Sequence, residues 1–600
     1  MDWNQELLNS AIWLAKAFAL SLVGLTIVVL WLAKATQWGR QVKRIAWPYF
    51  DPRKNWRPMA VLALLVLLTL FSVRMNVLLS FWYNGLYAAM QRLDADAFWF
   101  MMAVFGVLAT IHVARALFDF YVYQGLLIRW REALTHTLME RWLAHQTYHR
   151  SQYLAEQVDN PDQRIQEDIE QFASRTLALS LGMLNAIVSL VEFTIILWGL
   201  SGALALFGVE IPRGMIFVVY IYVLVATFIA AWLGRPLIRL NFLNELFNAN
   251  FRYGLIRLRE YAESIAFFRG ERVERVGLFG RFANVVQNMW DMLFRALKLQ
   301  GFNLGVSQVA VVFPMILQAP RLFSKEITLG DFMQTAEAFG QVQTALSFFR
   351  TSYDDFANYR AVLTRLSSFM DTLEHTEALP ALAAHGEGDR VAVRGLSVRT
   401  PAQQVLLNGL DLTLEPGDSL LIRGASGSGK TTLLRTMAGL WPFADGEVVR
   451  PQGERALFLP QKPYLPLGTL RTALYYPATA PAVSGGEDAA AEALRRVQLG
   501  HLVAQLDEEA DWTRILSLGE QQRLAIGRAL LANPAVLFLD ESSSAMDEGL
   551  EHAMYALLRE ALPQATLVSV GHRSTLRGFH ERELVLEGGG AWRIDQPASA

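Results

Sequence analysis

The 600-residue sequence contains no cysteine, few charged residues and almost no net charge. Because cysteine is absent, disulfide bonds, thiolate zinc sites and cysteine nucleophiles are excluded. The net charge of −2 gives no sign of a basic nucleic-acid-binding surface, so we expect no nucleic-acid partner. Charged residues make up 18% of the chain and apolar residues 53%, a balance that indicates contact with lipid. The first ten residues lack lysine and arginine, so the first apolar stretch is expected to be retained and not cleaved as a signal peptide.

Apolar residues are concentrated in stretches long enough to cross a membrane, which takes about 20 residues per helix. The candidates are residues 11–33, 59–83, 97–123, 177–207, 214–233, 302–317 and 332–349. The stretch 302–317 is short, and we expect it to continue an upstream helix. The last stretch has Gln, Thr and Glu on one side, which favours a helix that faces a wet cavity. A soluble amphipathic helix is the alternative for this stretch.

A glycine-rich segment lies between an expected strand at residues 419–423 and an expected helix at residues 431–440. Glycines allow backbone N–H groups to turn towards phosphate oxygens at a helix N-terminus. Lys430 would add a charge at the β- and γ-phosphates, and the Thr431 hydroxyl would ligate Mg²⁺. The sequence therefore predicts ATP and Mg²⁺ as cofactors. The predicted nucleotide-binding residues of this segment are Gly424, Ala425, Ser426, Gly427, Ser428, Gly429, Lys430, Thr431 and Thr432.

Further polar residues follow three more expected strands. Asp540 and Glu541 end the apolar stretch 536–539, where Asp540 would hold Mg²⁺ and Glu541 would polarise the attacking water. Gln461 follows the expected strand 456–459 and could reach both Mg²⁺ and this water. His572 follows the expected strand 566–570 and could contact the γ-phosphate and orient Glu541. We therefore predict Glu541, His572 and Gln461 as catalytic residues, and Thr431, Gln461 and Asp540 as metal ligands.

The composition changes near Glu374, which predicts two domains. We expect a helical polytopic membrane domain with cytoplasmic extensions at residues 1–373, a linker at 374–389, and an α/β nucleotide-binding domain at 390–600. The ATPase must lie where ATP is, so the C-terminus is cytoplasmic. Counting back through seven spans then places the basic segment 34–57 in the cytoplasm, in agreement with the positive-inside rule.

Two long polar stretches, residues 129–175 and 235–300, are cytoplasmic by this count and are proposed as coupling elements. We expect a helix break at residues 159–162 (DNPD) and a corner at Gly270. Solvated helix surface is the alternative for both stretches. Within the spans, Arg115 and Asp119 are spaced to pair with each other. Glu192 lies mid-span and is a candidate for the transport path, with a buried interhelical hydrogen bond as the alternative.

The segment LSLGEQQR (residues 516–523) and the segment SAMD (544–547) complete a series with the motifs above. Over residues 390–590 this series resembles the ATPase of ABC transporters. The resemblance implies that Ser517, Gly519 and Glu520 of the signature serve a nucleotide bound by the opposite subunit, and that Asp547 links the two sites. One phosphate loop and one signature per chain imply a half-transporter that forms a homodimer with two-fold symmetry. The chain departs from the usual pattern at Leu518, where glycine is common, and at Thr400, where many relatives have an aromatic residue that stacks on adenine.

Three segments, DNPDQRI (159–165), FFRGE (267–271) and LPQKPYLPLGTLR (459–471), carry a finer resemblance. They are similar to the BacA/SbmA-like group, whose members take up vitamin B12 and peptide antibiotics, and next to the fatty-acyl half-transporters of subfamily D. The resemblance implies an exporter-like fold in the lipid of a bacterial inner membrane, with the ATPase in the cytoplasm. The expected cargo is hydrophilic or amphipathic, such as a corrinoid or a peptide. A fatty-acyl or lipid transporter and a nucleotide-gated channel remain alternatives, whereas the apolar spans disfavour an ABC ATPase that acts on DNA or ribosomes.

Overall fold

The computed structural model describes residues 3–154, 160–202, 204–206, 209–380, 382, 384–385, 388–480 and 488–595. It contains two compact units. The first comprises Met1–Met139 and Asn160–Phe369, and the second comprises Glu140–Asp159 and Met370–Ala600.

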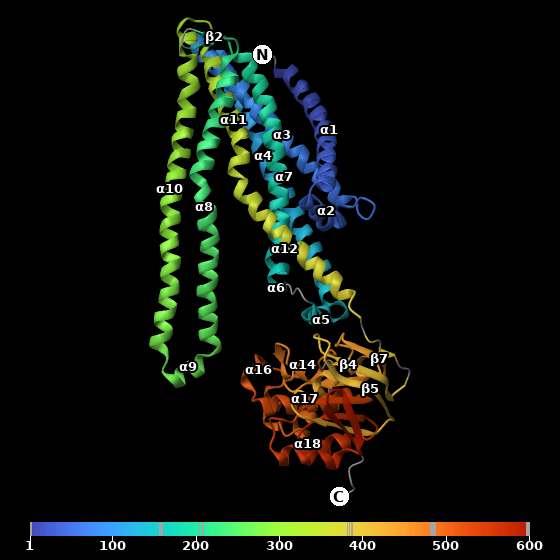
Figure 1. Cartoon of the computed structure of the whole chain (residues 1–600). Helices are drawn as coiled ribbons and strands as arrows, with labels where there is room; N and C mark the ends of the chain where they lie inside the picture. Colours follow the sequence, from blue (N-terminus) through green and yellow to red (C-terminus); the bar gives the residue numbers. More distant parts are fainter. Residues whose placement is uncertain are drawn as a thin grey trace. The chain divides into compact units, whose positions relative to one another are not determined.

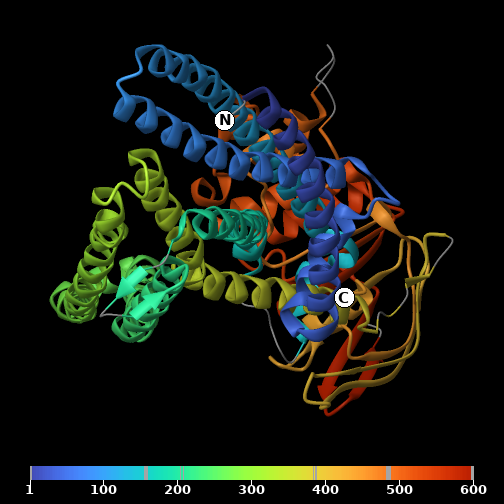
Figure 2. The ribbon, with the colours of Figure 1, turned by 90° about the horizontal axis from the view of Figure 1, so that it is seen from above.

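The first unit is helical. Its long helices are α1 (Trp3–Ala35), α3 (Arg57–Arg92), α4 (Ala95–Leu143), α7 (Ile169–Leu200), α8 (Gly214–Glu260), α10 (Glu271–Phe323), α11 (Leu329–Thr351) and α12 (Tyr353–Glu377), of which α4 and α12 run on into the second unit. Its short elements are α2 (Gln37–Phe50), α6 (Pro161–Gln163), the π-helical turn Arg164–Asp168, β1 (Leu204–Leu206), β2 (Val209–Ile211) and α9 (Ala262–Phe268). Helices α8 and α10 run side by side and are joined by α9 (Figures 1 and 2).

Among the described residues, six helical stretches are long and apolar enough to cross a membrane. They lie within residues 5–35, 57–92, 95–153, 161–200, 214–260 and 271–323. These stretches contain five of the first six predicted spans and most of the sixth, 177–207, and residues 302–317 continue an upstream helix as expected. Residues 332–349 form the helix α11, which is not among the six. Its apolar side packs in the bundle, because Phe339 and Val342 share a buried cluster with Val77 of α3, Phe193 of α7 and Val219 of α8.

The predicted span 177–207 was wrong at its C-terminal end, since α7 ends at Leu200. Ser201 adopts an extended backbone, and residues 204–206 instead pair with 209–211 as the antiparallel strands β1 and β2. The guanidinium of Arg321 from α10 hydrogen-bonds the Leu200 carbonyl over 3.4 Å and so helps to cap the helix. A Cβ atom at Gly202 would lie 2.4 Å from this guanidinium, so glycine permits the close approach.

The second unit is an α/β domain with two larger sheets. The six-stranded sheet has the order β14–β13–β6–β12–β11–β8, and its strands are β6 (Ser419–Gly424), β8 (Ala456–Leu459), β11 (Val536–Asp540), β12 (Thr566–Val570), β13 (Arg582–Gly588) and β14 (Ala591–Asp595). All neighbours in it are parallel except β13 and β14. The four-stranded sheet has the order β3–β7–β4–β5, from β3 (Ala384–His385), β4 (Val391–Arg399), β5 (Val405–Leu414) and β7 (Ala444–Val449). The short strands β9 (Gly468–Thr469) and β10 (Glu509–Ala510) pair with each other.

The helices of this unit are α5 (Thr147–Arg150), α13 (Lys430–Met437), α14 (Leu470–Tyr475), α15 (Ala489–Arg496), α16 (Trp512–Ile515), α17 (Leu518–Ala532) and α18 (Glu548–Ala561). Its 3₁₀ turns are Ala144–Gln146, Ser151–Tyr153, Gly453–Arg455, Gly500–Gln505 and Ser574–Phe579. The central strands of the six-stranded sheet are buried on both faces, because side chains alternate along each strand and each face is covered by its own hydrophobic cluster. In β11, Leu537 and Leu539 pack in the cluster with α14, α15, α17 and α18, whereas Val536 and Phe538 pack in the cluster with α13 and the four-stranded sheet.

The predicted linker at residues 374–389 is partly regular structure. Helix α12 continues to Glu377 because Leu373 and Thr376 are buried in this unit, and β3 pairs in parallel with β7. The physical reason is that a polar sequence can form a helix when one face finds a packing partner. Residues 381, 383, 386 and 387 lie outside the described residues.

The polar segment 140–154, which the sequence analysis placed in the membrane half, groups with the second unit. The chain bends there because His145 and Gln146 adopt left-handed backbone angles. Tyr153 packs edge-on against Trp441, with ring centroids 5.0 Å apart, and Arg150 donates to the carbonyls of Leu379 and Pro380. This segment is thus attached to the α/β domain by an aromatic contact and by a buried guanidinium.

The two predicted helix breaks are present. Asn160 has a left-handed backbone and Pro161 begins α6, while Asp159 lies outside the described residues. Gly270 separates α9 from α10, and Arg269 before it is left-handed. A helix therefore begins directly after the non-helical Asn160, and one helix ends and another begins around Gly270, as expected for a residue before proline and for a glycine corner.

Candidate nucleotide-hydrolysis site

Four parallel strands bring the predicted site residues to one edge of the sheet. β6, β12, β11 and β8 are consecutive neighbours, so their carboxyl ends lie on the same side. The phosphate loop 424–432 begins at Gly424, the last residue of β6, and His572 follows β12. Asp540 ends β11 and Glu541 follows it, and Gln461 follows β8. The expected strands 456–459, 536–539 and 566–570 are confirmed, and 419–423 lies within β6.

Glu541 is flanked by the two other predicted catalytic side chains. Gln461 Nε2 donates to Glu541 Oε2 over 3.1 Å, and His572 Nε2 lies 3.4 Å from Glu541 Oε1. The Glu541 backbone is left-handed, with φ 49°, and its N–H donates to the Val570 carbonyl over 3.1 Å. Such a backbone is uncommon for a residue with a side chain and is enriched at functional positions. The carboxylate is therefore held from both sides at the end of a buried strand.

The phosphate loop has the backbone that a phosphate cradle needs. Gly424 has φ 154°, and a Cβ atom there would lie 2.6 Å from the Leu586 carbonyl oxygen. Gly429 has φ 99° and starts α13. The buried Ser428 hydroxyl has no hydrogen-bond partner among the described residues, so the loop leaves a polar group for a ligand. These features fit the phosphates of ATP.

Lys430 lies with its ammonium against this loop. Its Nζ is 3.0 Å from the carbonyl oxygens of both Gly424 and Ala425. Burial lowers the pKa of the Lys430 ammonium, and the nearby carboxylates of Glu541 and Asp540 oppose that shift. The charge thus lies between the loop and the acids at the end of β11.

Thr431 and Asp540 form the candidate metal site. The Thr431 hydroxyl donates to Asp540 Oδ1 over 3.2 Å. Burial raises the pKa of Asp540, and the hydrogen bond from Thr431 acts in the opposite direction. Hydroxyl, carboxylate and amide oxygens are the ligands that Mg²⁺ prefers, usually together with substrate phosphates. The donor set Thr431, Asp540 and Gln461 therefore fits Mg²⁺.

The signature segment forms the capped start of α17. Ser517 is the N-cap: its N–H and hydroxyl donate to Glu520 Oε2 over 2.9 and 2.7 Å, and the Glu520 N–H donates back to the hydroxyl. The Ser517 hydroxyl lowers the pKa of Glu520. Glu520, predicted as a nucleotide-binding residue, has a capping role in this structure, which its S-x-x-E spacing signals. A Cβ atom at Gly519 would lie 3.0 Å from the Ala545 carbonyl, so glycine lets this helix approach the loop before Asp547. Asp547 itself caps α18 through the Leu550 N–H.

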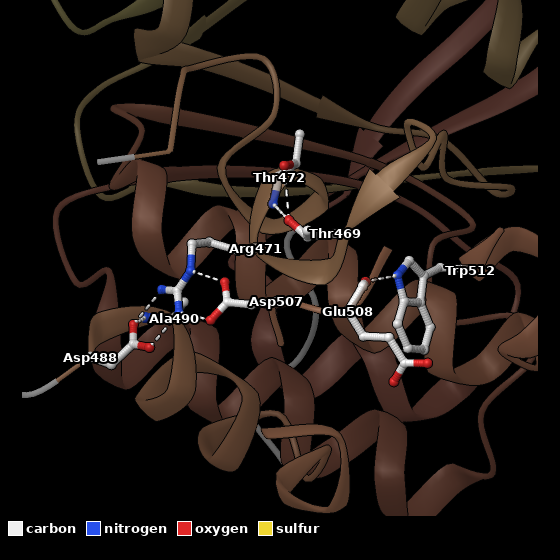
Figure 3. Close-up of polar contacts among 8 residues, drawn as sticks. All are labelled: Thr469, Arg471, Thr472, Asp488, Ala490, Asp507, Glu508 and Trp512. Carbon is white, nitrogen blue, oxygen red and sulfur yellow. Dashed lines mark hydrogen bonds and ion pairs between the residues drawn. The ribbon is translucent and has the colours of Figure 1, made fainter. Parts of the chain in front are cut away.

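Sequence reasoning missed an arginine that joins two parts of the domain. Figure 3 shows the Arg471 guanidinium between Asp488 and Asp507, with distances of 2.6 to 2.9 Å. Its hydrogen bonds, first to Asp507 and then to Asp488, raise the pKa of Arg471. Nearby, the Trp512 ring N–H donates to the carbonyl of Glu508 (Figure 3) and also to that of Gly468. These contacts tie the segment after Gln461 to the segment before Ser517.

In the first unit, the charged side chains of the spans bind one another. Trp13 of α1 donates from Nε1 to Glu192 Oε1 over 2.8 Å. Arg74 of α3 pairs with Glu6, donates to the Ser10 hydroxyl over 2.9 Å and lies over the Trp13 ring. The interhelical hydrogen bond considered for Glu192 is therefore present, and a role in transport stays a prediction. Arg115 and Asp119 pair as expected, with 3.9 Å between Arg115 Nη1 and Asp119 Oδ2.

Comparison with known families fits this division of the chain. Residues 45–323 match the family model of the ABC transporter transmembrane region 2, and residues 407–544 match the ABC transporter ATPase model. The fold and the site thus define a membrane domain fused to an ATP-hydrolysing domain.

The chain belongs to the ABC transporter family. It is 48% identical, over 99% of its length and 100% of the relative, to an uncharacterized ABC transporter ATP-binding protein of Haemophilus influenzae. It is 28% identical to the human lysosomal cobalamin transporter ABCD4, over 85% of this chain and 88% of the relative. A bacterial Atm1-family ABC exporter with ATP bound has a similar fold, with a TM-score of 0.66 at 17% identity over 89% of this chain and 94% of the exporter. The protein is therefore a half-transporter related to subfamily D, and its ATP hydrolysis is coupled to transport.

Proposed function

We propose that two copies of this chain form a transporter in a bacterial inner membrane that hydrolyses ATP to move a hydrophilic or amphipathic cargo, such as a corrinoid or a peptide. ATP hydrolysis is supported above all by the position of Glu541, which lies between Gln461 and His572 at the carboxyl edge of the sheet. The cargo class is supported by the similarity to the human lysosomal cobalamin transporter.

In this proposal the chain's own residues divide the work of hydrolysis. Loop 424–432 holds the phosphates with its N–H groups and with the Lys430 charge. Glu541 accepts a hydrogen bond from the attacking water and so polarises it, while Gln461 and His572 keep its carboxylate oriented. Mg²⁺, held by Thr431, Asp540 and Gln461, would neutralise charge on the phosphate oxygens.

The homodimer is proposed because each chain has one phosphate loop and one signature. Ser517 and Gly519 open α17, whose N-terminus favours an anion. Since the signature's serine hydroxyl is used in the cap, nucleotide binding would compete with its bond to Glu520. A site built from the phosphate loop of one copy and the signature of the other would explain why both elements are present in every copy, together with Asp547.

A polar face inside the membrane bundle supports a hydrophilic cargo. Asn84 of α3 donates to Asp331 and Gln334 of α11 over 3.0 and 2.7 Å, and Gln334 also bonds Ser80. Polar groups in apolar surroundings are costly and are commonly retained for function. We propose that this face belongs to the cargo path, as the polar pattern of residues 332–349 predicts. Glu192 remains a second candidate.

The cytoplasmic location of the ATPase is proposed from the distribution of positive charge, because Lys and Arg are frequent at residues 34–57 and rare at 84–96. For coupling, we propose two elements: segment 140–154, which packs on the α/β domain, and α9. Phe267 and Phe268 of α9 are 79% and 85% exposed, which is unusual for adjacent aromatic residues that have no partner surface.

Reconstitution tests the proposal. The purified chain is placed in sealed vesicles with MgATP on one side, and uptake of cobalamin, a cationic peptide and a long-chain acyl-coenzyme A is measured in parallel. We expect ATP-dependent movement of a corrinoid or a peptide, abolished in Glu541→Gln. Movement of the acyl compound alone would overturn the cargo class, and ATP-gated flux down a gradient without hydrolysis would indicate a channel.

A further inference from the structure

The loop between β11 and α18, residues 541–547, is held by side chains from two other segments of the site. We call it the junction loop; it begins with Glu541 and ends with Asp547. We propose that Gln522 and Arg573 are positioning residues for ATP hydrolysis, which clamp this loop and thereby fix the Glu541 carboxylate. The inference rests on the ATPase activity of the family and not on the identity of the cargo.

Gln522 forms the first half of the clamp. It lies on α17 five residues after Ser517, and its side chain is 0% exposed. Its Nε2 donates to the Gln461 carbonyl over 2.8 Å and to the Ser544 hydroxyl over 3.2 Å, and its Oε1 accepts from the Ala545 N–H over 3.0 Å. One carboxamide thus uses both N–H groups and its oxygen to join three segments: the residue that contacts Glu541, the signature helix and the junction loop.

Arg573 forms the second half of the clamp. It follows His572 directly, and its guanidinium donates to the Met546 carbonyl over 2.7 Å and to the Ser544 carbonyl over 3.3 Å. The carboxylate of Glu551 on α18 is buried and lies 3.7 Å from this guanidinium. Glu551 also accepts from the Ser543 hydroxyl over 2.6 Å, so the same carboxylate anchors the loop a second time.

The clamp connects both neighbours of Glu541 to the loop that begins with Glu541. Gln461 is joined to the loop through Gln522, and His572 through the adjacent Arg573. A shift of Gln461 or His572 must therefore break the hydrogen bonds to residues 544–546 or move these residues with it. Neither clamp residue belongs to the phosphate loop 424–432. Loss of the clamp should therefore displace the Glu541 carboxylate without weakening the binding of the ATP phosphates. This separates a positioning role from a general loss of structure.

The experiment measures steady-state ATP hydrolysis of the full chain in lipid nanodiscs, normalised to the amount of protein that binds a fluorescent ATP analogue. Gln522→Met keeps the volume of the side chain but has no hydrogen-bonding amide. We expect kcat to fall about tenfold, the usual consequence of unpairing buried polar groups, while KM for ATP changes less than about twofold. Arg573→Lys keeps the charge but cannot donate to two carbonyls in the guanidinium geometry. It should give a smaller fall in kcat, again at constant KM.

A double-mutant cycle and a matched control complete the test. If both residues act through one loop, the combined variant should lose clearly less than the product of the single effects. Arg559→Lys is the control, because Arg559 also donates to a backbone carbonyl, that of Gly417, yet touches neither the junction loop nor the residues around Glu541. Unchanged kcat in Gln522→Met, a parallel rise in KM, fully multiplicative effects, or an equal loss in the control would each overturn the proposal.

Discussion

The carboxyl edge of the six-stranded sheet and the interior of the membrane bundle both hold polar side chains, but they use them in opposite ways. At the sheet edge, polar side chains converge on one site, and some of their hydrogen-bonding groups have no partner within the described part of the protein. The Ser428 hydroxyl has none among the described residues, and Glu541 lies between Gln461 and His572 but is exposed enough to contact water. In the bundle, Glu192 is bound by Trp13, and Arg74 is bound by Glu6 and Ser10.

This difference in how polar groups are partnered distinguishes a site that binds and converts a substrate from a contact that only stabilises the fold. Convergence of groups from four strands, with a polar group left for a ligand, is what substrate binding requires. A helical bundle can keep charged side chains in apolar surroundings only when each one is paired with a partner on a neighbouring helix. We therefore expect substitutions at the sheet edge to change ATP turnover, and most substitutions of bundle charges to change stability.

The largest effect is expected for Glu541→Gln. Removal of the base should lower ATP turnover by about 100-fold or more, while nucleotide binding persists because the phosphate loop is intact. Phosphate release and equilibrium binding of a nucleotide analogue, measured on the same sample, check this. Near-normal turnover would remove Glu541 from the catalytic role and would break the contrast between the two regions.

The next effect concerns a bundle charge. Asp168 is 1% exposed and accepts from Arg365 Nε over 2.9 Å and from Arg164 over 3.0 Å. Asp168→Ala leaves two guanidinium groups unpaired and should lower the free energy of unfolding by about 3–5 kcal/mol, seen as an earlier thermal transition. Glu170→Ala is the control: its pair with Arg131 is exposed on both sides and should contribute less than about 1 kcal/mol. Equal shifts in the two variants would contradict the structural role of Asp168.

A third prediction concerns acid sensitivity of the α/β domain. Burial lowers the pKa of His580 from 6.5 to about 4, and its ring bonds the Leu576 carbonyl and the Ser569 hydroxyl. Because the folded pKa lies below the unfolded one, the stabilisation is present above pH 6.5 and is lost as the pH falls towards 4. At pH 5.5 the loss should be about 1.4 kcal/mol relative to neutral pH.

This pH dependence can be measured as thermal inactivation of the ATPase at pH 7.5 and pH 5.5. His580→Gln should be less stable at pH 7.5 but should lose less on acidification. The exposed His552 offers a matched control, since His552→Gln should keep the acid sensitivity of the parent chain. An unchanged pH response in His580→Gln would remove this residue as the cause.

The smallest effect is expected for Glu192. If it belongs to the transport path, Glu192→Ala should slow transport about fivefold, the scale of one lost hydrogen bond to the cargo, and should affect ATP hydrolysis less. Trp13→Phe removes the hydrogen bond between Trp13 and Glu192 but keeps the Glu192 carboxylate, so it measures the contribution of that hydrogen bond alone. Equal transport defects in the two variants would assign Glu192 to structure alone.

Much of the sheet edge could be predicted because it is local in sequence. Each site residue follows a short apolar run, and parallel strands must end on one side, so the sequence alone predicts that Gln461, Glu541 and His572 lie near one another. The capping box of Ser517 and Glu520 is equally local, and its S-x-x-E spacing could have found it.

The remaining features depend on contacts between distant residues, which leave no periodic pattern. Arg471 joins Asp488 and Asp507, and Tyr153 packs on Trp441, far along the chain. The end of α7 at Leu200 likewise depends on Arg321 of another helix. Apolar runs predict that a helix crosses the membrane, whereas where it stops and what it touches is decided by its neighbours.

The most direct test of the account is ATP hydrolysis by nanodiscs assembled to hold one copy or two copies of the full chain, separated by size before assay. We predict that two-copy discs hydrolyse ATP and that single-copy discs bind ATP but are nearly inactive, because each site would need the signature of a second chain. Equal turnover per chain in single-copy and two-copy discs would contradict the account.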